Sequence, residues 1–73
     1  MKRTQTIAGQ EVTLEVGKTY LAMGDPSTNG VEIREKSTNA VAHRFTARDR
    51  ASQNTFLGEF NNGASSFAGR VWQ

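Results

Sequence analysis

The feature that most constrains the fold of this chain is an alternation of apolar and polar side chains with a period of two. The alternation recurs in four segments of the sequence, 12–16, 31–36, 55–60 and 67–72. The first of them, for example, places Val12 and Leu14 on one face and Thr13 and Glu15 on the other. Successive side chains of a strand point to opposite faces, so each segment is predicted to be a half-buried β-strand.

Turn-forming residues separate the predicted strands. Asp-Pro and Asn-Gly in 24–30 favour a loop, and a second Asn-Gly in 61–66 favours a hairpin. Segment 19–23 is apolar on both faces and is predicted to be a central strand. Segment 46–54 contains fair helix formers but no apolar stripe, which predicts at most a short helical turn.

Five to six short strands with turns between them are typical of an all-β domain. We therefore expect a small antiparallel barrel or a strongly curved sheet, of the size of an SH3-like barrel. The 73 residues are predicted to form one domain over 1–73, with residues 1–6 disordered. The chain has no cysteine for a disulfide, so association into a homodimer or higher oligomer is one remaining way to stabilise so small a core.

Excess positive charge is concentrated in segment 34–50. The whole chain has a net charge of +2, and the candidate nucleic-acid contacts all lie in this segment. They are Arg34, Lys36, Arg44, Arg48 and Arg50. If 40–48 is a strand, Arg44 and Arg48 share one face, and a hairpin through 37–39 brings them beside the two earlier cations. Such a row of cations can follow a phosphate backbone, which predicts a nucleic-acid-binding module.

Two other interpretations stay open for the same surface. Glu32 lies on the predicted basic face and blunts its charge, and dispersed mixed charges are typical of a solvated surface. The alternative function is a protein-interaction module, such as a compact inhibitor or adaptor that occupies a partner's surface. Trp72 is its candidate protein-interface anchor, since tryptophan is enriched at interfaces, and closing one end of the core is the other role for that residue. Small cysteine-free chains of this kind are common among phage and mobile-element products.

Signals for catalysis are weak, and we expect no enzymatic activity, no cofactor and no metal site. Segment 17–19, Gly-Lys-Thr, lacks the earlier glycine of a phosphate-binding loop. His43 is the only histidine, and no serine lies on a recognisable strand-to-helix turn that would make it a nucleophile. The acidic residues are dispersed. No segment has the apolar length of a signal peptide or a membrane span, so we expect a cytoplasmic protein without a membrane partner.

Overall fold

The structure is a computed structural model that describes residues 1–62 and 69–73. This part of the chain folds into six strands and one helix. In chain order they are β1 (Lys2–Ile7), β2 (Gln10–Glu15), β3 (Thr19–Gly24), β4 (Gly30–Glu35), β5 (Val41–Thr46), α1 (Arg50–Asn62) and β6 (Arg70–Val71). Strands therefore predominate, as the period of two predicts.

The strands form two antiparallel sheets. β1 and β2 make a hairpin through a tight turn at Ala8 and Gly9, both of which have positive φ. The other four strands make a second sheet in the order β5-β4-β3-β6. The predicted central strand, 19–23, is β3 and pairs with a neighbour on each side. A bulge between Ile33 and Arg34 shifts the register between β4 and β5.

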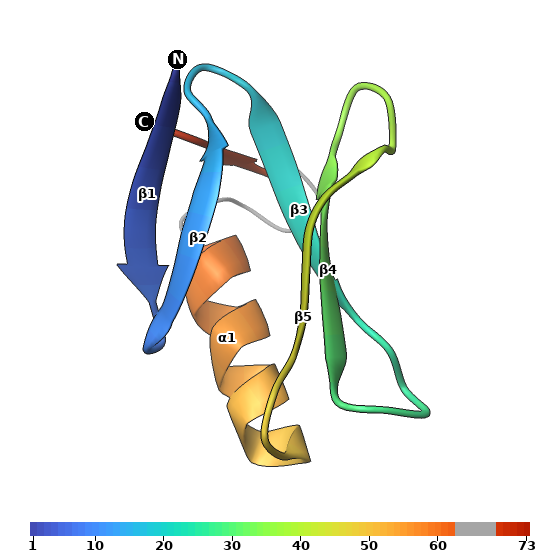
Figure 1. Ribbon diagram of the computed structural model, residues 1–73. Helices are drawn as coiled ribbons and strands as arrows, with labels where there is room; N and C mark the ends of the chain where they lie inside the picture. The colour runs from blue at the N-terminus through green and yellow to red at the C-terminus, as the bar shows by residue number, and fades with distance from the viewer. Residues whose placement is uncertain (63–68) are drawn as a thin grey trace.

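The two sheets do not close into the barrel that the strand rhythm suggested. β2 and β5 face each other across the open seam without pairing, while α1 fills the space beneath them (Figure 1). Residues 2–6, expected to be disordered together with residue 1, lie in β1 and pair with β2. Of the strand predicted over 67–72, the described part forms β6, and residues 67 and 68 lie outside the described residues. Residues 63–66 of the predicted hairpin turn also lie outside them.

The main error of the sequence interpretation concerns residues 55–60, which are helical and not a strand. Phe56 and Phe60 are four residues apart, a spacing that places them on one face of either a strand or a helix. An N-terminal cap favours the helix: Asp49, just before α1, accepts at Oδ1 a hydrogen bond of 2.7 Å from the backbone N–H of Ser52. The short turn predicted near 46–54 is thus the beginning of a 13-residue helix.

The core lies between α1 and the inner faces of both sheets. Among the described residues, ten apolar ones are buried there: Ile7, Val12, Leu14, Tyr20, Ala22, Val31, Ile33, Phe56, Phe60 and Trp72. Ring contacts run through it from Phe45 to Phe56, from Phe56 to Phe60 and from Phe60 to Trp72, with centroids 4.8, 5.8 and 5.9 Å apart. Within residues 1–62 and 69–73, no helix has the length and apolar character needed to cross a bilayer.

Candidate binding surface

The four-stranded sheet has a second face, turned away from α1 and the core. Cross-strand pairing places Met23 beside Glu32 and Glu32 beside Arg44 in one row. The next row contains Leu21, Arg34 and Val41. Val71 on β6 lies opposite Thr19, one row further along β3. We call this surface the outer face and define it by the residues Leu21, Met23, Glu32, Arg34, Val41, Arg44 and Val71.

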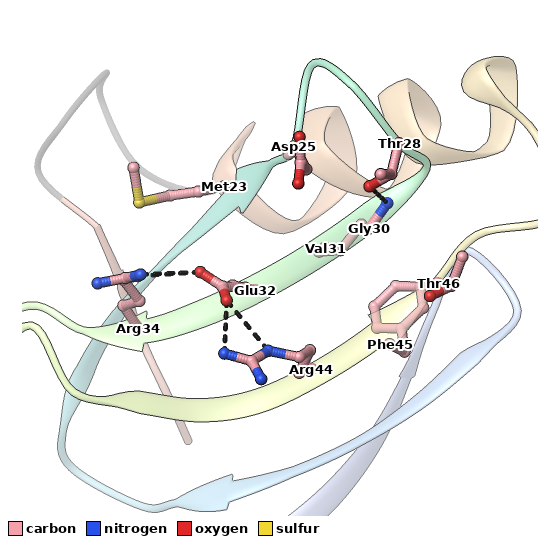
Figure 2. Close-up of a pocket in the computed structure, with 11 residues that line it drawn as sticks. Met23, Asp25, Thr28, Gly30, Val31, Glu32, Arg34, Arg44, Phe45 and Thr46 are labelled. Atoms are coloured by element: carbon pink, nitrogen blue, oxygen red, sulfur yellow. Dashed lines mark hydrogen bonds and ion pairs between the residues drawn. The ribbon is translucent and has the colours of Figure 1, made fainter.

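A single carboxylate holds both arginines of the outer face. Arg34 donates from Nη2 to Glu32 Oε1 over 2.9 Å, and Arg44 donates to Glu32 Oε2 from Nη2 over 2.7 Å and from Nε over 3.0 Å. Figure 2 shows the two guanidinium groups approaching the carboxylate from different sides. Hydrogen bonds from Arg34, and then from Arg44, hold the pKa of the Glu32 carboxyl below its ordinary value of 4.5.

A hollow of about 450 Å³ lies next to this cluster, over β4 and below the loop at 25–30. Glu32, Arg34 and Arg44 line one part of it, and the loop's Asp25 lines another (Figure 2). Met23 adds exposed apolar surface to the lining. Bonds from the Ser27 backbone and hydroxyl to Asp25 lower the pKa of that carboxyl, so it is ionised at neutral pH.

The loop beside the hollow is fixed from below by Gln53, a buried polar residue of α1. Its side-chain Nε2 donates to the carbonyl oxygens of Gly30 and Asp25 over 2.9 and 3.1 Å, and to that of Thr28 over 3.4 Å. Gly24 makes this approach possible, because a Cβ there would lie 2.8 Å from Leu57 Cδ1 and 3.0 Å from Gln53 Nε2. The helix therefore sets the position of one wall of the hollow.

The structure brings together only part of the predicted basic row. Arg34 and Arg44 are neighbours on the outer face, and Lys36 follows β4 on the exposed surface at its far end. β5 ends at Thr46, so Arg48 and Arg50 leave the sheet. Arg48 lies 3.5 Å from its neighbour Asp49. Arg50 begins α1 and donates from Nη2 to the carbonyl of Pro26 over 2.6 Å.

Trp72, the candidate interface anchor, is in the core and fully buried. Its ring stacks on Phe60, and its indole Nε1 donates to the carbonyl of Arg3 on β1 over 2.9 Å. Its backbone bonds to Gly17 and Lys18 in the turn between β2 and β3. A side chain enclosed on all sides cannot insert into a partner, so the interface role is corrected to the structural one.

Sequence reasoning missed the apolar component of the outer face. Four large apolar residues are exposed in the described ranges, and three of them are on this face: Met23, Val41 and Val71, which are 49, 40 and 52 % exposed. They come from three different strands, and only the strand order β5-β4-β3-β6 brings them onto one surface. His43 points the other way, and its buried Nε2 has no hydrogen-bond partner in the part of the chain described.

Comparisons with known protein families, with curated proteins and with solved structures find no match to this chain. The arrangement of the outer face and the hollow is therefore the basis for the functional argument.

The Glu32 cluster predicts an acid-sensitive contribution to stability. Because the pKa of Glu32 is lower in the folded chain, its contribution is present above pH 4.5 and is lost as the pH falls through the lowered value. We expect Glu32→Gln to be less stable than wild type near pH 7, with the difference disappearing in acid. Urea denaturation over a pH series measures this. Glu11→Gln, which changes an exposed carboxyl on β2, is the control, and a stability gap for Glu32→Gln that is constant with pH would contradict the interpretation.

Proposed function

We propose that the protein is a non-enzymatic binding module that docks a partner protein on the outer face of the four-stranded sheet. The observation that carries the proposal is that Met23, Val41 and Val71, which are exposed, lie on the same face of the sheet as the Glu32 cluster. Methionine and arginine are enriched at protein interfaces.

The charges of the outer face indicate the chemistry of the partner. Arg34 and Arg44 oppose one acid, Glu32, which leaves the face with an excess of positive charge. Two copies of such a face would repel each other, so a second copy of the chain is disfavoured as the occupant. A partner surface with apolar side chains and acidic residues at its edge complements it.

The titratable groups of the hollow support binding in preference to catalysis. A general base or acid works best when its pKa lies near the working pH. Hydrogen bonds lower the pKa values of both Asp25 and Glu32 and keep them ionised. Such carboxylates serve as fixed acceptors and charges.

Contact with nucleic acid is the second candidate function, and Arg48 is the observation that favours it, since its side chain is 86 % exposed. Two features of the structure weigh against it. Glu32 offsets part of the positive charge of the arginines on the outer face. Among residues 1–62 and 69–73, the aromatic rings are buried or half-buried, so the described surface offers no ring on which bases could stack.

Affinity capture with matched variants tests the proposal. The double variant Met23→Thr/Val71→Thr removes exposed apolar surface and keeps residues that favour strands. We expect a partner protein captured from a lysate of the source organism to bind wild type and Glu11→Gln, and to bind the double variant at least about tenfold more weakly. Nuclease treatment should leave capture unchanged. Capture that the double variant retains, or that nuclease abolishes, would contradict a protein partner on this face.

A further inference from the structure

Arg44 presents one edge of its guanidinium group to solvent. Nε and Nη2 both donate to Glu32 Oε2, so the side edge of the group is occupied. Nη1 has no hydrogen bond or ion pair with the part of the chain that the structure describes, and the side chain is 67 % exposed. The remaining edge, made by Nη1 and the second hydrogen of Nη2, has the geometry that binds a carboxylate through two parallel hydrogen bonds.

Arg44 is also held in one orientation before any ligand arrives. Glu32 is itself fixed, because Arg34 donates to its other oxygen, and Arg34 Nη1 donates to the carbonyl of Asn39 over 3.3 Å. The side chain of Arg44 therefore has less conformational freedom to lose when it binds a ligand, and ordering of long side chains is one of the main costs of association.

The hollow next to Arg44 limits the charge that a ligand can carry. Two acids, Asp25 and Glu32, and two arginines, Arg34 and Arg44, line it, so its ionised groups sum to zero. A phosphate monoester or a run of phosphodiesters carries more than one negative charge, so Asp25 and Glu32 repel it more strongly than they repel one carboxylate. A single carboxylate carries one charge and can bind the open guanidinium edge of Arg44. Met23, which is 49 % exposed and lines the hollow, supplies an apolar contact for the stem of such a carboxylate.

We propose that Arg44 is the specificity-determining residue of the outer face and binds an aspartate or glutamate side chain of the partner protein, whose stem enters the hollow over β4. This inference rests on the proposed function, because it names the group on the partner that the docking surface recognises.

Solution NMR with small probes tests the inference without the partner. The ¹⁵N-labelled protein is titrated at pH 7 and constant ionic strength with N-acetyl-glutamate α-amide, with N-acetyl-glutamine amide and with inorganic phosphate. We expect saturable shifts of the Arg44 Nε–H signal and of the backbone amides at Gly24, Gly30 and Thr46 with the glutamate probe alone. The glutamine probe has the same stem without the charge.

Variants identify the group that binds. Arg44→Gln is expected to abolish the saturable shifts, and Arg44→Lys, which keeps the charge without the planar edge, to weaken them at least about tenfold. Arg48→Gln changes an exposed arginine outside the hollow and should leave them unchanged. The amide signals of core residues show whether each variant is folded, and Arg44→Lys carries the test if Arg44→Gln is not.

Three results would overturn the inference: no saturable shift at Arg44, equal shifts with the glutamine probe, or tighter binding of phosphate than of the carboxylate. The last result would point to a nucleic-acid backbone. The NMR probes do not require the partner, so the two proposals can fail separately. If the glutamate probe binds Arg44 but capture does not depend on Met23 and Val71, the proposed function is rejected while the carboxylate site is retained.

Discussion

Replacing Trp72 by alanine is expected to lower the free energy of unfolding by about 3–5 kcal/mol, the range for deleting a large aromatic side chain from a core. The side chain is fully buried and stacks on Phe60, and the guanidinium of Arg70 covers both rings at 5.5 and 5.6 Å. It also joins β1 to the end of the chain through its bond to the carbonyl of Arg3. A domain of this size has a total stability of only about 5–10 kcal/mol, so the variant should be largely unfolded at modest urea concentrations.

Urea denaturation followed by far-ultraviolet circular dichroism measures the loss in the Trp72 variant. Trp72→Phe is the matched control, since it keeps an aromatic ring on Phe60 and removes only the indole donor to Arg3. We expect it to lose less stability than the alanine variant. A Trp72→Ala protein within about 1 kcal/mol of wild type would show that the ring is not part of the core and would reopen its role at an interface.

Replacing Gln53 by methionine is the second change with a large expected effect. Methionine has a similar length but no donor, so the carbonyls of Gly30, Asp25 and Thr28 each lose a partner in a buried setting. Leaving buried polar groups without a partner costs about 1–3 kcal/mol. The carbonyl of Gly30 keeps a hydrogen bond from the backbone of Asp25, and the carbonyl of Asp25 keeps one from the backbone of Thr28. These two carbonyls are therefore not left without any partner, and the total cost stays within this range.

Two further variants separate the hydrogen bonds of Gln53 from its packing. Gln53→Glu has the same shape but turns an acceptor toward the three carbonyls, so it should be less stable than Gln53→Met. Asn54→Ala changes an exposed neighbour on α1 and should stay within about 0.5 kcal/mol of wild type. Amide signals of residues 25 and 27–30 should shift in the Gln53 variants. Gln53→Met with wild-type stability and an unchanged loop spectrum would contradict the role of Gln53 in holding the wall of the hollow.

Several strands of this fold could be predicted from local sequence because their apolar residues alternate, as Val12 and Leu14 do in β2. The helix could not be found in this way. Phe56 and Phe60 satisfy both periods, and the signal that distinguishes them is the cap at Asp49, three residues before Ser52. Whether the sheets close into a barrel could not be predicted from the local alternation either. It depends on whether β2 and β5 pair with each other, and in this fold they do not.

The candidate site was predictable where it depends on neighbouring strands. The β4–β5 hairpin brings Arg34 and Arg44 together, and Glu32 reduces the charge of that face as the alternation implied. The contribution of Val71 could not be foreseen, because it requires β6 to pair with β3 from the other end of the chain. The role of Gln53 was hidden for a similar reason, since its partners lie 23 to 28 residues earlier in the sequence.

Site-specific photo-crosslinking tests the docking surface most directly. A benzophenone amino acid is placed at Met23 on the outer face or, as a control, at Glu11 on β2, and the protein is irradiated in cells of its source organism. The account predicts a discrete crosslinked protein from position 23, absent from position 11 and lost when Arg44→Gln is added. Crosslinks from position 11 alone, or crosslinks to nucleic acid from position 23, would contradict a protein partner on the outer face.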